Sequence, residues 1–120
     1  MRKVTIYQYP KCGTSRKAVK WLQEHDVEMD SIPIVESPPS AEQLAEFVRK
    51  SGLDIKKFFN TSGEVYKEMN LKDRLPELSD EQKIGLLAAN GKLIKRPIVT
   101  DGNRVTVGFN EEQFEEIWGG

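Results

Sequence analysis

Apolar and polar residues alternate over residues 4–8 and then recur at helical spacing, which predicts a strand followed by a helix. The strand is VTIYQ, and the helix runs from Thr14 to about Asp26. A second strand is predicted over residues 28–35, EMDSIPIV, where Pro33 lacks an N–H group and so places this strand at a sheet edge. The apolar positions at helical spacing are Ala18, Val19, Trp21 and Leu22.

Helix starts are marked further along the chain by Ser or Asn with Gln three residues later, the pattern of a capping box. The segment between the first two starts, residues 53–78, is expected to hold short helical pieces, after a stop at Gly52. The third start opens a last helix at the C-terminal end. Ser40–Gln43 and Ser79–Gln82 are predicted capping boxes, and Asn110–Gln113 is predicted as a third cap.

Residues 96–109, RPIVTDGNRVTVGF, are typical of a β-hairpin, with a type I′ turn predicted at Asp101-Gly102. The element order is therefore β-α-β, a helical block, β-β and α. Two strands joined through a helix are parallel, whereas the hairpin adds antiparallel strands. The sequence predicts an α/β fold of thioredoxin type, with a mixed four-stranded sheet. We expect one domain over residues 1–120, with a helical insertion at about 40–90 between the second and third strands.

The composition narrows the classes of function. A length of 120 residues favours one domain, and a net charge of -1 argues against a nucleic-acid protein built on a basic face. No apolar run approaches the ~20 residues that span a bilayer, and the start MRKVTIYQYP does not have the pattern of a signal peptide. One cysteine cannot form an internal disulfide. One cysteine and one histidine are also too few ligands for a structural zinc site of the usual kind. We expect a cytoplasmic monomer with no bound metal or cofactor.

The single thiol, Cys12 in YPKCGTSRKA, stands where the first strand ends and the first helix begins. A helix N-terminus presents unpaired N–H groups and positive potential, and both favour thiolate over thiol. Lys11, Arg16 and Lys17 would add to this effect if they point toward the sulfur. The alternative, a buried and inert cysteine, is the less favoured interpretation at a strand-to-helix junction.

An anion can be held beside this thiol by the same N–H groups. Gly13 allows a close approach of the backbone, while Thr14 and Ser15 offer hydroxyl groups. A phosphatase loop is excluded, because it needs an arginine six positions after the cysteine and the residue there is Ala18.

Four segments together make the chain similar to the ArsC/Spx family of thioredoxin-fold proteins, which includes glutaredoxin-linked arsenate reductases and Spx-type regulators. They are PKCGTSRKA, FFNTSGEVYKEMNL, LIKRPIV and VGFNEEQFEEIW, and the resemblance covers about residues 3–118. It implies that Cys12 is the nucleophile and that CGTSR is an anion-binding loop. It also implies that Arg96 binds the oxyanion, and that Pro97 follows a cis peptide bond and faces the cysteine.

The resemblance to the reductases is partial. Asn60 and Gly108 stand where those enzymes carry arginines, and Gln8 stands where they carry a histidine. Because arginine suits bidentate oxyanion binding, we expect weak arsenate reduction at best. Ser15 replaces the second cysteine of the C-x-x-C switch that Spx-type regulators commonly use. The candidate catalytic residues are thus Cys12 and Arg96; the candidate substrate-binding residues are Lys11, Gly13, Thr14, Ser15, Arg16, Asn60 and Pro97.

Two functions of different classes follow from this resemblance. The favoured one is a thiol oxidoreductase in which glutathione is a co-substrate, and glutaredoxin or a thioredoxin-type reductant resolves the intermediate formed at Cys12. The alternative is an Spx-like regulator or adaptor that binds RNA polymerase, with Cys12 as a redox sensor. Neither interpretation requires direct contact with nucleic acid or a membrane.

Overall fold

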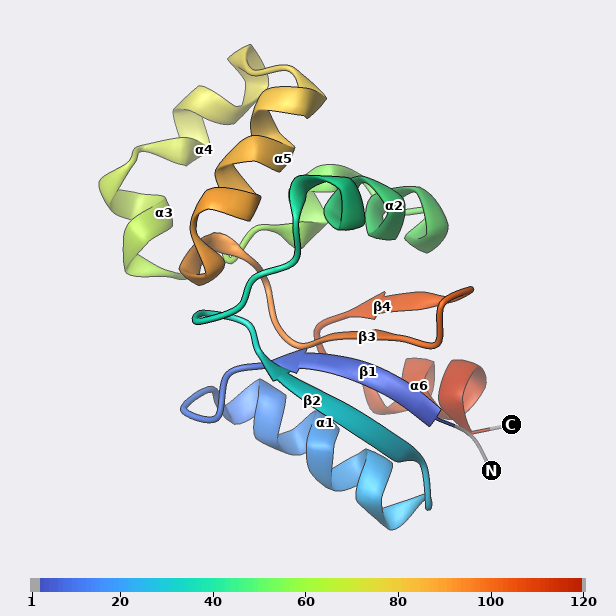
Figure 1. Cartoon of the computed structure of the whole chain (residues 1–120). Coiled ribbons are helices and arrows are strands. Elements are labelled where there is room, and N and C mark those ends of the chain that lie inside the picture. Colours follow the sequence, from blue (N-terminus) through green and yellow to red (C-terminus); the bar gives the residue numbers. More distant parts are fainter. Residues whose placement is uncertain (1–2, 120) are drawn as a thin grey trace. The chain divides into compact units, whose positions relative to one another are not determined.

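The computed structural model describes residues 3–119 and divides the chain into two compact units (Figure 1). The first unit contains the N-terminal part up to Pro33 and the C-terminal part from Arg96. The second unit, Ile34–Lys95, is made of helices. The first unit carries the cysteine, so it is the unit that positions the site.

The sheet of the first unit has four strands in the order β2-β1-β3-β4. β1 pairs parallel with β2 and antiparallel with β3, and β3 pairs antiparallel with β4. The predicted mixed sheet is therefore confirmed, as is the edge position of the strand that contains Pro33. The strand bounds are β1 Lys3–Gln8, β2 Glu28–Pro33, β3 Ile98–Thr100 and β4 Val105–Val107.

Two helices, α1 (Gly13–Glu24) and α6 (Glu111–Trp118), cover the same face of this sheet (Figure 1). The ring of Trp21 meets that of Phe114 edge-on, with centroids 5.4 Å apart, so the two helices also pack against each other. Burial of this apolar surface fixes α1 on the sheet and thereby fixes the position of its N-terminus. The buried cluster comprises Val4, Ile6, Ala18, Trp21, Leu22, Val27, Val99, Phe114 and Trp118.

The turn between β3 and β4 differs from the prediction. A type I′ turn at Asp101-Gly102 needs positive φ at both residues, but only Gly102 has it, at 97°. The N–H of Asp101 donates to the carbonyl of Arg104 at 3.4 Å, which makes Gly102-Asn103 the centre of the turn. The Asp101 carboxylate instead accepts the backbone N–H groups of Asn103 and Arg104, at 2.9 and 2.8 Å. The predicted type I′ turn is therefore wrong, and the turn lies one residue later.

Seven short helices form the second unit, and the predicted caps set two of their starts. Both capping boxes are present, at Ser40 and Ser79, and Gly52 ends its helix with φ 71°. The third predicted cap, Asn110, also accepts the N–H of Gln113 at the start of α6, at 3.1 Å. The helices are α2 Ala41–Ser51, η1 Ile55–Phe58, α3 Glu64–Glu68, α4 Leu71–Arg74, η2 Leu75–Glu77, α5 Asp80–Ala89 and η3 Gly91–Leu93.

Candidate functional site

Cys12 caps the N-terminus of α1. After β1 ends, the N–H of Cys12 donates to the carbonyl of Tyr9 at 2.8 Å, which closes a tight turn. Cys12 then has extended backbone angles, φ -90° and ψ 123°, and its carbonyl accepts the N–H of Arg16 at 3.1 Å. The strand-to-helix junction therefore leaves the half-buried side chain of Cys12 beside the unpaired N–H groups of the first helical turn.

The pKa of the Cys12 thiol is lowered below the ordinary value of a cysteine. Partial burial is the largest single influence and raises the pKa, because it disfavours the charged thiolate. Hydrogen bonds to the sulfur from the backbone N–H groups of Ser15 and Thr14, and from the side chains of Arg96 and Ser15, together outweigh burial. Four donors thus converge on one atom and stabilise it as an anion.

Ser15 is fully buried and connects the thiol to Tyr9, the residue directly after β1. Its Oγ accepts the backbone N–H of Tyr9 at 3.2 Å, while its hydroxyl donates to the Cys12 sulfur. A hydroxyl group can do both at once, because it has one donor and two acceptor positions. Ser15 therefore holds the loop and the thiolate together.

Arg96 reaches the sulfur from the segment that leads into β3. Its half-buried guanidinium donates to Cys12 and also lies over the ring of Tyr9, with Cζ 4.8 Å from the ring centroid. The Arg96–Pro97 peptide bond is cis, as the resemblance implied. Pro97 is buried, and its carbonyl accepts the N–H of Gly108 at 2.8 Å, which ties this segment to the end of β4.

The structure brings Cys12, Thr14, Ser15 and Arg96 together at the sulfur. Three other basic residues do not contribute to this arrangement. Lys11, Arg16 and Lys17 are exposed, and none of them is among the groups that shift the Cys12 pKa. The contribution that we expected from them if they pointed toward the sulfur is therefore not found. Gly13 is exposed at the start of α1, and an ideal Cβ on it would lie 3.9 Å from Nη2 of Arg16.

Asn60 belongs to the helical unit, where its backbone is well tied. Its N–H donates to the carbonyl of Leu93 at 2.7 Å, and its carbonyl accepts the N–H of Gly63 at 3.1 Å. These contacts explain a local structural role. Its part in anion binding stays a prediction.

Sequence reasoning missed Tyr9, whose ring supports the guanidinium of Arg96 and whose backbone binds both Cys12 and Ser15. The available signal was an aromatic residue directly before Pro10 in the loop that carries the only cysteine. Within residues 3–119, no cluster of three His, Cys, Asp or Glu side chains is suited to a metal ion. The same described part of the chain has no helix long and apolar enough to cross a membrane.

Comparison with known proteins adds three informative relatives. YusI of Bacillus subtilis (strain 168) is 59% identical over 96% of this chain and 98% of its own length. The global transcriptional regulator Spx of Streptococcus mutans is 32% identical over 92% of this chain and 79% of its own length. The solved structure of arsenate reductase from Vibrio cholerae has 30% identity and a TM-score of 0.82, over 98% of this chain and 97% of that one.

These likenesses extend over nearly the whole chain. They agree with an α/β fold of thioredoxin type, in which a helical block is inserted between the second and third strands of a mixed sheet. The relatives include both a reductase and a regulator, so they support a thiol oxidoreductase or a regulator of this type. The model of the ArsC family matches residues 7–117, and the chain therefore belongs to the ArsC family.

Proposed function

We propose that this protein is a thiol oxidoreductase in which Cys12 is the nucleophile and an external thiol resolves the intermediate. The observation that carries the proposal is the convergence of four hydrogen-bond donors on the Cys12 sulfur, which lowers its pKa. A thiolate is the reactive form of cysteine, and an inert structural cysteine needs no such set of donors. The similarity to the Vibrio cholerae arsenate reductase supports the same class of reaction.

The reaction that the site supports best is thiol–disulfide exchange with a glutathionylated substrate. The Cys12 thiolate attacks the glutathione sulfur, the bond to the substrate sulfur breaks, and the substrate leaves as a thiolate that takes a proton from water. Cys12 then carries glutathione. A second glutathione thiolate, free or aided by glutaredoxin or a thioredoxin-type reductant, attacks this adduct. It releases the Cys12 thiolate and forms glutathione disulfide, which balances the two electrons given to the substrate.

Arsenate is the poorer substrate in this proposal. Arg96 supplies a fixed cation beside the thiolate, but Gly108 stands at one position where the resemblance implies a second arginine. Gly108 has φ 80°, and its N–H donates to the carbonyl of Pro97. This position therefore contributes a backbone hydrogen bond and no side chain. A non-glycine residue would be strained at that φ. A doubly charged oxyanion would therefore be held by fewer charge-assisted contacts, each of which contributes ~1.5–3 kcal/mol.

A second candidate function is regulation, and the 32% identity with an Spx over 92% of the chain favours it. In that case the chain acts as an adaptor for RNA polymerase, and oxidation or glutathionylation of Cys12 is the signal. The same lowered pKa would make Cys12 responsive to oxidants. The two functions differ in turnover: a sensor reacts once, whereas an enzyme is restored by thiol in each cycle.

The deciding experiment measures turnover of the mixed disulfide of glutathione and 2-mercaptoethanol, with glutathione, glutathione reductase and NADPH as the coupled readout. We expect multiple turnovers that increase when glutaredoxin is added and that are absent in Cys12→Ser. Arsenate, assayed in parallel, should give much slower turnover. A single stoichiometric glutathionylation of Cys12 with no turnover, together with retention of RNA polymerase from purified components, would favour the regulator instead.

A further inference from the structure

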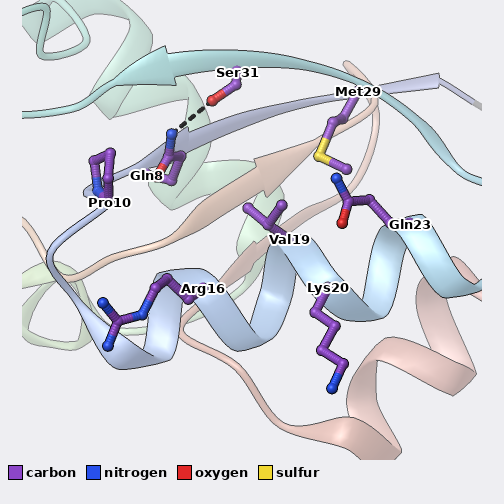
Figure 2. A pocket seen from close by; sticks show the side chains of 8 residues that line it. All are labelled: Gln8, Pro10, Arg16, Val19, Lys20, Gln23, Met29 and Ser31. Carbon is purple, nitrogen blue, oxygen red and sulfur yellow. Dashed lines mark hydrogen bonds between the residues drawn. The ribbon is translucent and has the colours of Figure 1, made fainter.

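A groove of about 400 Å³ lies beside α1, on the side of the edge strand β2 (Figure 2). Its size falls within the range of about 300–1,000 Å³ that is usual for small-molecule sites. All residues that line it belong to the first unit, and Cys12 is not among them. The lining residues are Gln8, Pro10, Arg16, Val19, Lys20, Gln23, Met29 and Ser31.

The floor of the groove is mainly apolar and is formed by Val19, Met29 and Pro10. Val19 points from α1 toward the strands, between the side chains contributed by β1 and β2 (Figure 2). Met29 packs partly into the core and so leaves its remaining surface to the groove. Gln8 Nε2 donates to Ser31 Oγ at 2.8 Å, which holds the polar end of the floor in place. An apolar body of a ligand would find contact with Val19, Met29 and Pro10.

The charged side chains that line the groove are all positive. Two of the eight lining residues, Arg16 and Lys20, are basic, and none is acidic. Both side chains are exposed and extend outward from α1 (Figure 2). Within residues 3–119, neither of these two groups forms a salt bridge. In Figure 2 the side chain of Lys20 points away from Val19 and Met29, but long, flexible side chains of this kind can turn toward a ligand at the edge of the groove. A groove with an apolar floor and only cations at its edge favours an anionic ligand with an apolar body.

From this arrangement we infer that the groove between α1 and β2 is a binding site for a small organic anion, with an apolar or aromatic body over Val19 and Met29 and a carboxylate or similar acid group at Arg16 and Lys20. Neither Cys12 nor the residues that bond its sulfur, Thr14, Ser15 and Arg96, line the groove. The site is therefore separate from the proposed exchange reaction. Its occupancy does not need the thiol.

The test is NMR titration of the full chain with 2-naphthoate, an aromatic carboxylate, followed on the methyl signals of Val19 and Met29. We expect saturable shifts confined to the lining residues, and the same affinity in Cys12→Ser. Lys20→Gln and Arg16→Gln should each weaken binding by about two- to five-fold, because exposed ion pairs are individually weak. The neutral analogue 2-naphthalenemethanol should bind less tightly than 2-naphthoate.

Lys17→Gln is the matched control, because Lys17 is exposed on the same helix, carries the same charge and does not line the groove. Binding that falls equally in Lys17→Gln and Lys20→Gln would mean general attraction to a basic surface and would overturn the inference. Shifts scattered over the surface, or equal binding of the neutral analogue, would overturn it as well. Val19→Gln, which places a polar amide on the floor, should abolish binding. The other methyl signals should keep the chemical shifts of the folded protein.

Discussion

The guanidinium of Arg96 donates a hydrogen bond to the sulfur of Cys12, although the two residues are far apart in the sequence. The first strand and helix place the thiol, and the segment before β3 places the cation, so neither element makes the site alone. The ring of Tyr9 lies 4.8 Å from Cζ of Arg96 and limits where the guanidinium can go. This arrangement is the basis of the first three predictions.

The rate of Cys12 alkylation by iodoacetamide should rise with pH, with a midpoint below about 8.5, the ordinary pKa of a free cysteine. The reason is that Ser15, Thr14 and Arg96 stabilise the thiolate more than burial destabilises it. The same protein unfolded in urea is the control, since its thiol has lost these donors. Equal midpoints for the folded and unfolded chains would contradict the assignment.

Stability should depend on pH through the same group. A folded-state pKa below the unfolded one gives a contribution that is fully present above the unfolded value and is lost as pH falls through the folded value. The free energy of unfolding of the wild type, minus that of Cys12→Ser, should therefore be larger at pH 9.5 than at pH 5. Urea unfolding at both pH values measures this difference. A difference that is constant with pH would show that the thiolate is not stabilised by folding.

Arg96→Ala should raise the pKa of Cys12 and lower thiol–disulfide turnover by about ten-fold or more, because a charge-assisted hydrogen bond to the thiolate is lost. Arg96→Lys should restore part of the turnover and part of the lowered pKa, since lysine returns the positive charge without the planar guanidinium group. Arg16→Ala is the matched control: its side chain is exposed and does not bond the sulfur. If Arg16→Ala and Arg96→Ala have equal effects on the alkylation midpoint, general surface charge explains the pKa.

Local features of the fold could be predicted from the sequence, because their causes are local. The capping boxes at Ser40 and Ser79 join groups three residues apart, and the structure contains both. The turn after β3 was misplaced by one residue, because the pairing of Thr100 with Val105 fixes the hairpin register and a single sequence does not reveal it. The dipeptide Asp101-Gly102 is a turn signal, but the carboxylate of Asp101 closes the turn from outside its centre.

The site was predictable to the extent that it depends on a helix N-terminus. The placement of Cys12 followed from the change of period between β1 and α1. The direction of the exposed side chains of Lys11 and Lys17 could not be known, and the charge expected from them at the sulfur is not found. The contact of Tyr9 with Arg96 joins distant parts of the chain, so the aromatic residue before Pro10 could mark the loop but not its partner.

Gly91→Ala and Gly85→Ala should have opposite effects on stability. A Cβ at Gly91 would overlap the backbone at Ile34 and Val35, which cannot yield as a side chain would, so we expect a loss of ~1–3 kcal/mol. A Cβ at Gly85 in α5 meets nothing within 4 Å, and alanine there should stabilise the helix by ~0.5–1 kcal/mol. Urea unfolding of both variants measures the pair. A stabilising Gly91→Ala would show that the approach of these two segments is looser than described.

Ser15→Cys should convert the protein from dependence on external thiol to internal resolution. The Ser15 hydroxyl already bonds the Cys12 sulfur, so a thiol at this position lies within reach of a glutathione adduct on Cys12. After treatment with glutathione disulfide, the wild type should keep one glutathione per chain, whereas Ser15→Cys should release it and form an internal disulfide. Intact mass distinguishes these products. Thr14→Cys is the matched control, because residue 14 is exposed and bonds the sulfur only through its backbone. A stable adduct on Ser15→Cys would mean that this side chain does not approach the reacting sulfur.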